Sequence, residues 1–313
     1  MELKQDIVQR LDALEKKYAV MGQDMISYLD GLLYADYLTY WDYIHLDTLL
    51  SLQTPKTNFK DEVIFIGYHQ ITELYFKLIL WEMAQINEAT EISEDWLLVK
   101  VGRCVRYFQT LVHSFDVMVD GMDKDEFLKF RMSLLPASGF QSAQYRKIEL
   151  CSTDFVNLIY KEKRWELGGM EDLETLFEHL YWKNGGRELK SGKKTLTLEQ
   201  FEGKYDEELL RLAHDMSTKN IWQQVQKLCP QALKNEKLVH EMRNLDIHAN
   251  VQWPHSHLKS AVRYLKLDPE DIKATGGTNW QKYLPPKIQF IMFFPELWTK
   301  QEKEDWGRKL SSL

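Results

Sequence analysis

Two histidines in apolar, helix-forming surroundings are the residues of this chain best suited to chemistry. His69 lies in the middle of the run at 61–83 with aromatic residues on both sides, and His257 lies far downstream in a second helical pattern. Two neutral imidazoles from distant segments, with aromatic lining and no cysteine pair, suit a haem pocket with a proximal and a distal side. For His69 taken alone, a hydrogen-bonded core histidine is the alternative.

Other histidine motifs do not point to a metal site made of side chains alone. His240-Glu241 has no second histidine four residues on, so the HExxH zinc motif is missing. His255 and His257 are two residues apart, which places them about 200° apart around a helix, so both cannot bind one metal from it. The sequence also lacks the GxSxG motif of serine hydrolases.

Three further features are candidates for binding a ligand. Arg131 follows Phe127 by one turn on an apolar helix end, which suits bidentate capture of a carboxylate, with a surface ion pair as the alternative. The turn in PASGFQSAQYR at 136–146 offers backbone amides and hydroxyls. The Gly-Gly loop at 274–284 permits close backbone approach but lacks the phosphate-loop pattern. Ordinary turn chemistry is the alternative for both loops.

Composition argues against nucleic-acid and membrane partners and favours a reducing compartment. The chain has 313 residues, a net charge of −7 and no block of five basic residues, so nucleic acid is not an expected partner. No apolar run approaches the roughly 20 residues of a membrane helix, so no membrane association is expected. The three cysteines, Cys104, Cys151 and Cys229, are widely spaced, which favours a reducing, cytoplasmic location.

Apolar spacing predicts an all-α fold in one large helical domain over 1–313. Long helices are expected at 4–20, 61–88, 93–119, 205–228, 236–250 and, after a stop at Trp253-Pro254, 256–266. The polar, glycine-containing segment 183–204 is predicted to be an exposed excursion. The haem pocket is expected inside the helix bundle.

Four segments of this sequence resemble the tryptophan 2,3-dioxygenase family. They are LTYWDYIHLDTLLSLQ at 38–53, DEVIFIGYHQITELYFKLILWEM at 61–83, EFLKFRMSLLPASGFQSAQYRKIE at 126–149, and the proximal-histidine helix, TGG loop and FFPELW within 253–298. The resemblance spans most of the chain in the expected order, and the PASGFQS loop with the HQxxEL helix is its most specific part. It implies a haem-dependent dioxygenase that inserts both atoms of O₂ across the indole C2–C3 bond of L-tryptophan, giving N-formyl-L-kynurenine.

The resemblance also implies roles for individual residues. His257 matches the axial ligand of the iron of haem b, which is ferrous in the active form, and Ser138 lies beside the haem. Substrate contacts are implied for Phe65, His69, Phe127, Arg131 and Thr275. His69 and Arg131 are the residues expected to act most directly. His69 would accept a hydrogen bond from the indole N–H, and Arg131 would pair with the substrate carboxylate.

The same resemblance implies a homotetramer, a dimer of dimers with exchanged N-terminal helices. Residues 1–50 would form an arm on a neighbouring subunit, and Tyr40, Tyr43 and Ile44 would enter that subunit's active site. Two other functions stay open at this point. One is a related haem-dependent oxygenase that acts on a substituted indole or a tyrosine-like amino acid, and the other is a non-catalytic haem or tryptophan sensor.

Overall fold

The computed structural model describes residues 4–36, 38–134, 141–167, 169, 172–188, 191–265 and 284–308. The chain divides into two compact units, Met1–Thr54 and Pro55–Leu313. In the described residues the regular structure is helical, with β pairing limited to two isolated bridges, Ile159 with Leu180 and Arg187 with Lys194. The predicted all-α class is confirmed.

The regular structure of the N-terminal unit is helical in its described residues. Helix α1 spans Gln5–Val20, as the amphipathic pattern predicts, and α2 spans Met25–Leu33 with Asp24 as its side-chain cap. Two short helices follow, α3 at Tyr40–Tyr43 and α4 at Leu46–Leu50. No described residue of this unit is buried, although its helices carry many apolar side chains.

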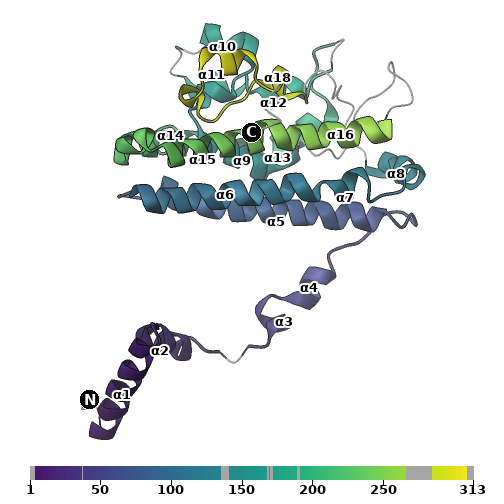
Figure 1. Cartoon of the computed structure of the whole chain (residues 1–313). Helices are drawn as coiled ribbons and strands as arrows, with labels where there is room; N and C mark the ends of the chain where they lie inside the picture. The colour runs from purple at the N-terminus through teal and green to yellow at the C-terminus, as the bar shows by residue number, and fades with distance from the viewer. Residues whose placement is uncertain are drawn as a thin grey trace. The chain divides into compact units, whose positions relative to one another are not determined.

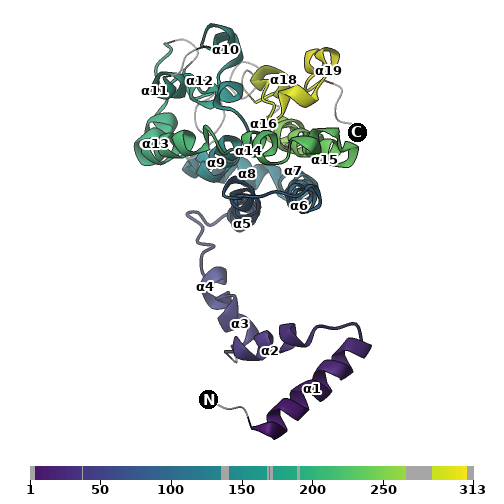
Figure 2. The same ribbon diagram turned by 90° about the vertical axis from the view of Figure 1, so that its left-hand side faces the viewer.

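Three long helical rods form the base of the second unit (Figure 1). Helix α5 spans Glu62–Asn87 and packs beside α6, which spans Glu94–Ser114 and begins at a Ser93 cap. The third rod consists of α15 (Glu236–Ile247), the π-helix η5 (His248–Gln252) and α16 (Trp253–Leu265), and it packs along α6. The end-on view shows α5 and α6 side by side under the other helices of this unit (Figure 2). The predicted helices at 61–88 and 93–119 are confirmed, the latter continuing into α7 (Asp116–Val119).

Two predicted helix limits are wrong. The segment 205–228 is two helices, α13 (Leu196–Met216) and α14 (Ile221–Leu228), because Asn220 caps the second through its bond to the Gln223 amide. The expected stop at Trp253-Pro254 does not occur. The π-helix precedes Pro254, which then lies in the first turn of α16, where its missing N–H is tolerated.

Shorter helices cover the rods. Helix α9 (Ala143–Ser152) packs on α5, and α13 packs on α9. Further short helices are α8 (Lys124–Phe130), α10 (Lys161–Leu167), α11 (Leu173–Phe177), α12 (Tyr181–Gly185), α18 (Pro286–Gln289) and α19 (Lys300–Glu304). Within the predicted excursion 183–204, Lys183, Leu198 and Phe201 are buried, and 191–193 are exposed.

The core of the second unit is built from the facing sides of these helices. Its largest cluster includes Ile79 and Met83 of α5, Leu97 and Phe108 of α6, and Leu245 of α15, each with almost no exposed surface. A smaller cluster joins Ile247 and Val251 to the C-terminal aromatic residues. Apolar burial of this extent is the main force that holds the rods together. Among the described residues, no helix is long and apolar enough to cross a membrane.

Candidate functional site

The ends of four helices meet at one end of the second unit. Helix α5 and helix α8 are tied at their first turns, because the Asp61 amide donates to the Glu126 carboxylate at 3.0 Å and the Asp123 amide donates to Asp61. Asp123 also caps α8 by accepting from the amides of Asp125 and Glu126. These bonds fix the start of α5, which carries His69, against the helix that carries Phe127.

His69 lies two turns into α5 and is half-buried. Its Nδ1 is 2.7 Å from the carbonyl oxygen of Phe65, one turn earlier. A carbonyl can only accept, so Nδ1 carries the hydrogen and Nε2 keeps a lone pair. Burial lowers the pKa of His69, so the ring is neutral at pH 7 and can accept a hydrogen bond through Nε2.

His257 on α16 has the same arrangement. Its Nδ1 is 3.1 Å from the carbonyl oxygen of Trp253, and its ring packs against Trp253 and Phe115 with centroids 4.6 Å apart in each case. Burial and, to a smaller extent, interaction with His69 together lower the pKa of His257 to about 4. The two imidazoles therefore lie in the same interior region, each with Nε2 left to meet a ligand.

His255 belongs to a different surface. Burial lowers its pKa, and its other neighbours are Lys259 and the backbone of Gly307. It does not take part in the ring contacts that His257 makes with Trp253 and Phe115. The geometry therefore favours His257 over His255 as the histidine that faces His69.

Aromatic side chains form the walls around the two histidines. Phe65 is 4.1 Å from His69 and 6.3 Å from Phe127, between ring centroids, and both phenylalanines are half-buried. Phe127 in turn packs on Tyr264 of α16 at 4.5 Å. The Tyr264 hydroxyl lies 3.2 Å from the carbonyl oxygen of Val119 and 3.3 Å from that of Met122, and its one hydrogen is shared between them. This contact holds the end of α16 against the turn before α8.

The structure adds aromatic residues that the sequence analysis did not assign to the site. Phe115 contacts Tyr68, Trp253 and His257, and Phe130 contacts Phe65 and Phe127. The spacing of Tyr264, two turns after His257, could have marked it as a residue on the same helix face. Phe130 follows Phe127 by three residues on α8, so the same reasoning could have marked it. Phe115 carries no such signal, because it lies between α6 and α7 and meets the site only through tertiary packing.

Arg131 lies at the edge of this region. It is the first residue of the 3₁₀ helix η1 (Arg131–Leu134), its amide donates to Phe127, and its side chain is half-buried. Burial lowers the pKa of its guanidinium, which stays charged at neutral pH. Ser138 and Thr275, the other two residues expected near the cofactor and substrate, lie outside the described residues.

Tyr40, Tyr43 and Ile44 belong to the N-terminal unit. Tyr40 and Tyr43 are the ends of α3 and are 70% and 74% exposed, so neither is covered within this chain. Ile44 is half-buried and ends α3, and the left-handed backbone of His45 then turns the chain into α4.

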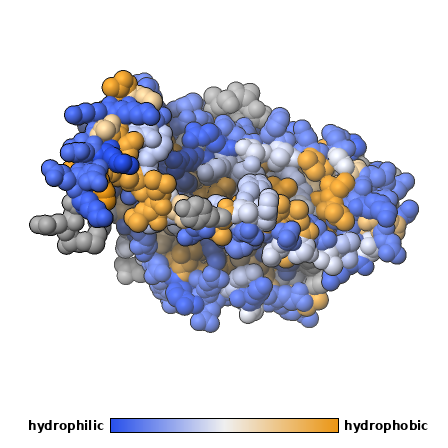
Figure 3. All heavy atoms as spheres, turned by 90° about the horizontal axis from the view of Figure 1, so that it is seen from below, coloured by the Kyte–Doolittle hydropathy of each residue, from blue (hydrophilic) through white to orange (hydrophobic). Residues whose placement is uncertain are grey.

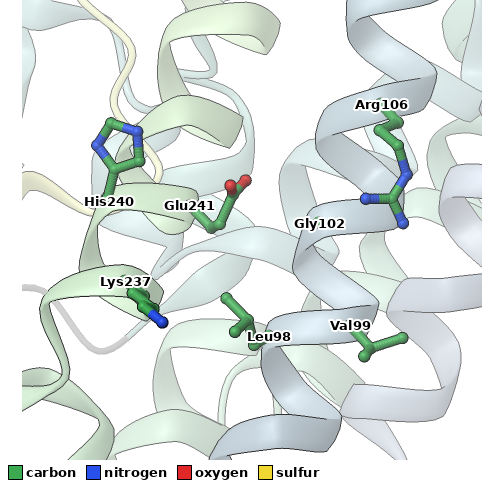
Figure 4. Close-up of a pocket in the computed structure, with 7 residues that line it drawn as sticks. All are labelled: Leu98, Val99, Gly102, Arg106, Lys237, His240 and Glu241. Carbon is green, nitrogen blue, oxygen red and sulfur yellow. The ribbon is translucent and has the colours of Figure 1, made fainter.

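A surface groove with a volume of about 360 Å³ lies elsewhere in the second unit, between α6 and α15 (Figure 4). Val99 and Arg106 line one side, and Lys237, His240 and Glu241 line the other. His240 precedes His257 by 17 residues, which is about 25 Å along a helix. The groove is therefore separate from the paired histidines.

The side chains of the histidine region suit a flat, largely apolar cofactor whose metal would take one imidazole from the protein. An iron porphyrin in a histidine-ligated protein takes one neutral imidazole from the protein, whose other ring nitrogen usually donates to a carbonyl. His257 meets both requirements through Nε2 and the Nδ1 contact with Trp253. The neighbouring aromatic rings supply apolar walls.

The comparisons with known proteins identify the family of this chain. Residues 32–154 match the family model described as tryptophan 2,3-dioxygenase. The tryptophan 2,3-dioxygenase of Exiguobacterium sibiricum is 30% identical over 271 residues, which cover 83% of this chain and 90% of that protein. The tryptophan 2,3-dioxygenase of a Ruegeria species is 28% identical over 268 residues, covering 82% and 89%. The chain belongs to the tryptophan 2,3-dioxygenase family.

Proposed function

We propose that this protein inserts both atoms of O₂ across the indole C2–C3 bond of L-tryptophan and releases N-formyl-L-kynurenine. The proposal is supported by the relatives named tryptophan 2,3-dioxygenase and by family membership. The observation that carries it is the pair His69 and His257, two neutral imidazoles from distant helices that face one aromatic-walled region.

His257 would bind the iron of haem b through Nε2, with Ser138 beside the macrocycle. When bound in its ferrous form, haem b supplies the chemistry that activates O₂. The contact between Nδ1 of His257 and the Trp253 carbonyl fixes the ring orientation and increases the basicity of Nε2.

The substrate would be held from its two ends. His69 would accept the indole N–H at Nε2, and Phe65 and Phe127 would pack against the indole ring and exclude water. Arg131 and Thr275 would bind the carboxylate and the amino-acid end. His69 needs no role as a base in this scheme, because an orienting hydrogen bond accounts for its position.

The test is a single-turnover reaction with product mass as the readout. Haem-loaded ferrous protein receives L-tryptophan without oxygen and is then mixed with O₂, and His257→Ala serves as the control. A product that gains two oxygen atoms and absorbs as N-formylkynurenine is expected. A gain of one oxygen atom would instead indicate a mono-oxygenase, and no product from a protein that binds haem and tryptophan would indicate a sensor.

The active assembly is proposed to be a homotetramer, a dimer of dimers. The N-terminal unit supports this proposal because its apolar side chains find no cover within the chain. None of its described residues is buried, and Ile26, Leu32 and Leu33 are 64–74% exposed. Helix α5 also exposes an apolar stripe, which contains Ile71, Leu74, Leu78 and Trp81. Apolar surface of this extent usually marks an interface. Figure 3 shows hydrophobic side chains, in orange, among hydrophilic ones on the surface seen from below.

In this assembly Tyr40, Tyr43 and Ile44 would enter the active site of a neighbouring subunit. Co-expression of two inactive variants tests this arrangement. A Tyr43→Ala chain keeps its own His257, and a His257→Ala chain keeps its own Tyr43. Mixed tetramers should regain part of the activity, because some sites then receive both intact residues. Activity no higher than the sum of the two separate variants would contradict a shared site.

The proposed location is the cytoplasm. The three cysteines are free thiols, and all three side chains are buried. Thiols that stay unpaired are typical of a reducing compartment. Labelling of the three thiols after denaturation of protein taken from its source would check this point, because disulfide-bonded protein would leave them unlabelled.

A further inference from the structure

The rod that carries His257 contains one irregular turn. Helices α15 and α16 continue each other in one straight rod (Figure 1), and the π-helix η5 joins them. The Trp253 amide donates to the carbonyl of His248, five residues earlier. A π turn of this kind takes up one residue more than an α turn, and such turns are frequent at functional sites.

The extra residue decides which way His257 points. In a regular α-helix each residue turns about 100°, so the 12 residues from Leu245 to His257 would leave His257 about 120° from the direction of Leu245. Taking up one residue in the π turn reduces this difference to about 20°. Leu245 faces the main core, and so do Trp253 and Tyr264. The π turn therefore returns the second half of the rod to the core-facing side.

Tyr145 of α9 satisfies a carbonyl in this turn. Pro254 is five residues after Ala249 and has no N–H, so it cannot donate to the Ala249 carbonyl in the π register. The Tyr145 hydroxyl donates to that carbonyl instead, at 2.8 Å, and both groups are buried. A buried carbonyl without a donor is unfavourable, so this bond stabilises the π turn.

Asp246 holds the other side of the turn. Its Oδ1 accepts from the Asn250 amide group and from the Phe293 backbone amide, both at 2.8 Å. Its Oδ2 accepts from the Phe294 amide at 3.2 Å and from Nε1 of Trp298 at 2.9 Å. The carboxylate has no exposed surface. It therefore connects the last turn of α15, the π turn and the C-terminal segment into one hydrogen-bonded unit.

We propose that Asp246 and Tyr145 are positioning residues that fix the π turn and thereby direct Nε2 of His257 toward the cofactor. The inference rests on the proposed function only in taking His257 as the axial ligand. Neither residue touches the reacting atoms, and both act through the path of the helix backbone.

The first experiment compares haem affinity in two backgrounds, by titration of haem into the apoprotein. With His257 present, Asp246→Asn and Tyr145→Phe should each weaken haem binding by about 10–100-fold, the range for residues that orient a metal ligand. In a His257→Gly background supplied with free imidazole, the same substitutions should change affinity by less than about threefold, because the ligand is no longer attached to the rod.

Tyr181→Phe is the matched control for Tyr145→Phe. Tyr181 is also buried and hydrogen-bonded, but its partners are Arg146 and Glu149 rather than the rod. It should leave haem affinity unchanged in both backgrounds. Equal losses of affinity with and without the tethered His257 would overturn the proposal, because they would show that Asp246 and Tyr145 support the pocket as a whole.

The same experiment separates this inference from the proposed function. If His257→Gly binds haem as tightly as the parent protein without imidazole, His257 is not the axial ligand, and both the ligand assignment and this inference fail. If His257→Gly loses haem and imidazole restores it, the ligand assignment stands, and the Asp246 and Tyr145 variants alone decide the inference.

A change in rod length gives an independent test. Deletion of Asn250 should convert the π turn into an α turn and leave His257 on the same face, so haem should still bind. Insertion of one alanine after Asn250 should rotate His257 by about 100° and abolish axial ligation, seen as loss of the histidine-ligated haem spectrum. Equal damage from the deletion and the insertion, in variants with helical circular dichroism, would contradict the proposed role of the π turn.

Discussion

Replacement of His69 by phenylalanine tests the most specific chemical statement about the site. The substitution keeps a flat ring that can pack on Phe65, whose centroid is 4.1 Å from that of His69. It removes Nε2, the nitrogen proposed to accept the indole N–H. In the parent protein the contact of Nδ1 with the Phe65 carbonyl fixes the tautomer and leaves Nε2 as the acceptor. The substitution therefore removes the nitrogen that would accept this bond.

The expected size follows from the burial of this region. A typical hydrogen bond contributes about 1 kcal/mol, but a buried donor left without a partner costs about 1–3 kcal/mol. An indole N–H that faces a phenyl ring in the buried site falls in the second case. We therefore expect a loss of about 2 kcal/mol, which is roughly a 30-fold rise in the Kd of L-tryptophan.

The assay measures Kd for L-tryptophan and for 1-methyl-L-tryptophan, using the change in haem absorption under anaerobic conditions. The methylated ligand has no N–H to donate, so His69→Phe should alter its Kd by less than about threefold. The difference between the two ligands isolates the hydrogen bond from general effects on the pocket. Equal losses for both ligands would refute the proposed bond.

Arg131→Lys should weaken L-tryptophan binding by about 1.5–3 kcal/mol, because lysine lacks the planar fork that pairs with a carboxylate; tryptamine, which has no carboxylate, should bind both proteins equally, and a parallel loss would argue against this role. Burial raises the pKa of Asp246 to about 6, from 3.8, so the folded protein holds this proton more tightly than the unfolded chain. The contribution of Asp246 to the unfolding free energy should therefore fall by about 2 kcal/mol from pH 4.5 to 7. Urea unfolding should show this slope in the parent protein and not in Asp246→Asn, and identical slopes would contradict the assignment. Lys100→Met should destabilise the fold by about 2–4 kcal/mol, because it leaves the buried Glu82 carboxylate with only the half-exposed Arg103, and adding Glu82→Leu should restore most of the loss in the same unfolding assay.

Much of the site could be read from the sequence because its parts are local patterns. The apolar spacing around His69 predicts α5, and the acidic residues at 61–62 mark its start. His69 with Phe65, and His257 with Trp253, are each one helical turn apart, so their contacts are set by helix geometry. The similarity to the tryptophan 2,3-dioxygenase family then joined these separate patterns into one expected site.

Only the tertiary structure decided how these patterns are joined. The sequence alone predicted that Trp253-Pro254 would end a helix, because a proline there cannot continue the usual hydrogen bonds. The rod continues because the Tyr145 hydroxyl, 104 residues earlier in the chain, donates to the Ala249 carbonyl in the π turn. The Asp246 carboxylate is held in addition by donors 47–52 residues later in the chain. Partners this distant leave no local pattern. The direction of the His257 side chain therefore depends on packing between distant segments. The sequence alone was enough to predict His257 as a candidate ligand.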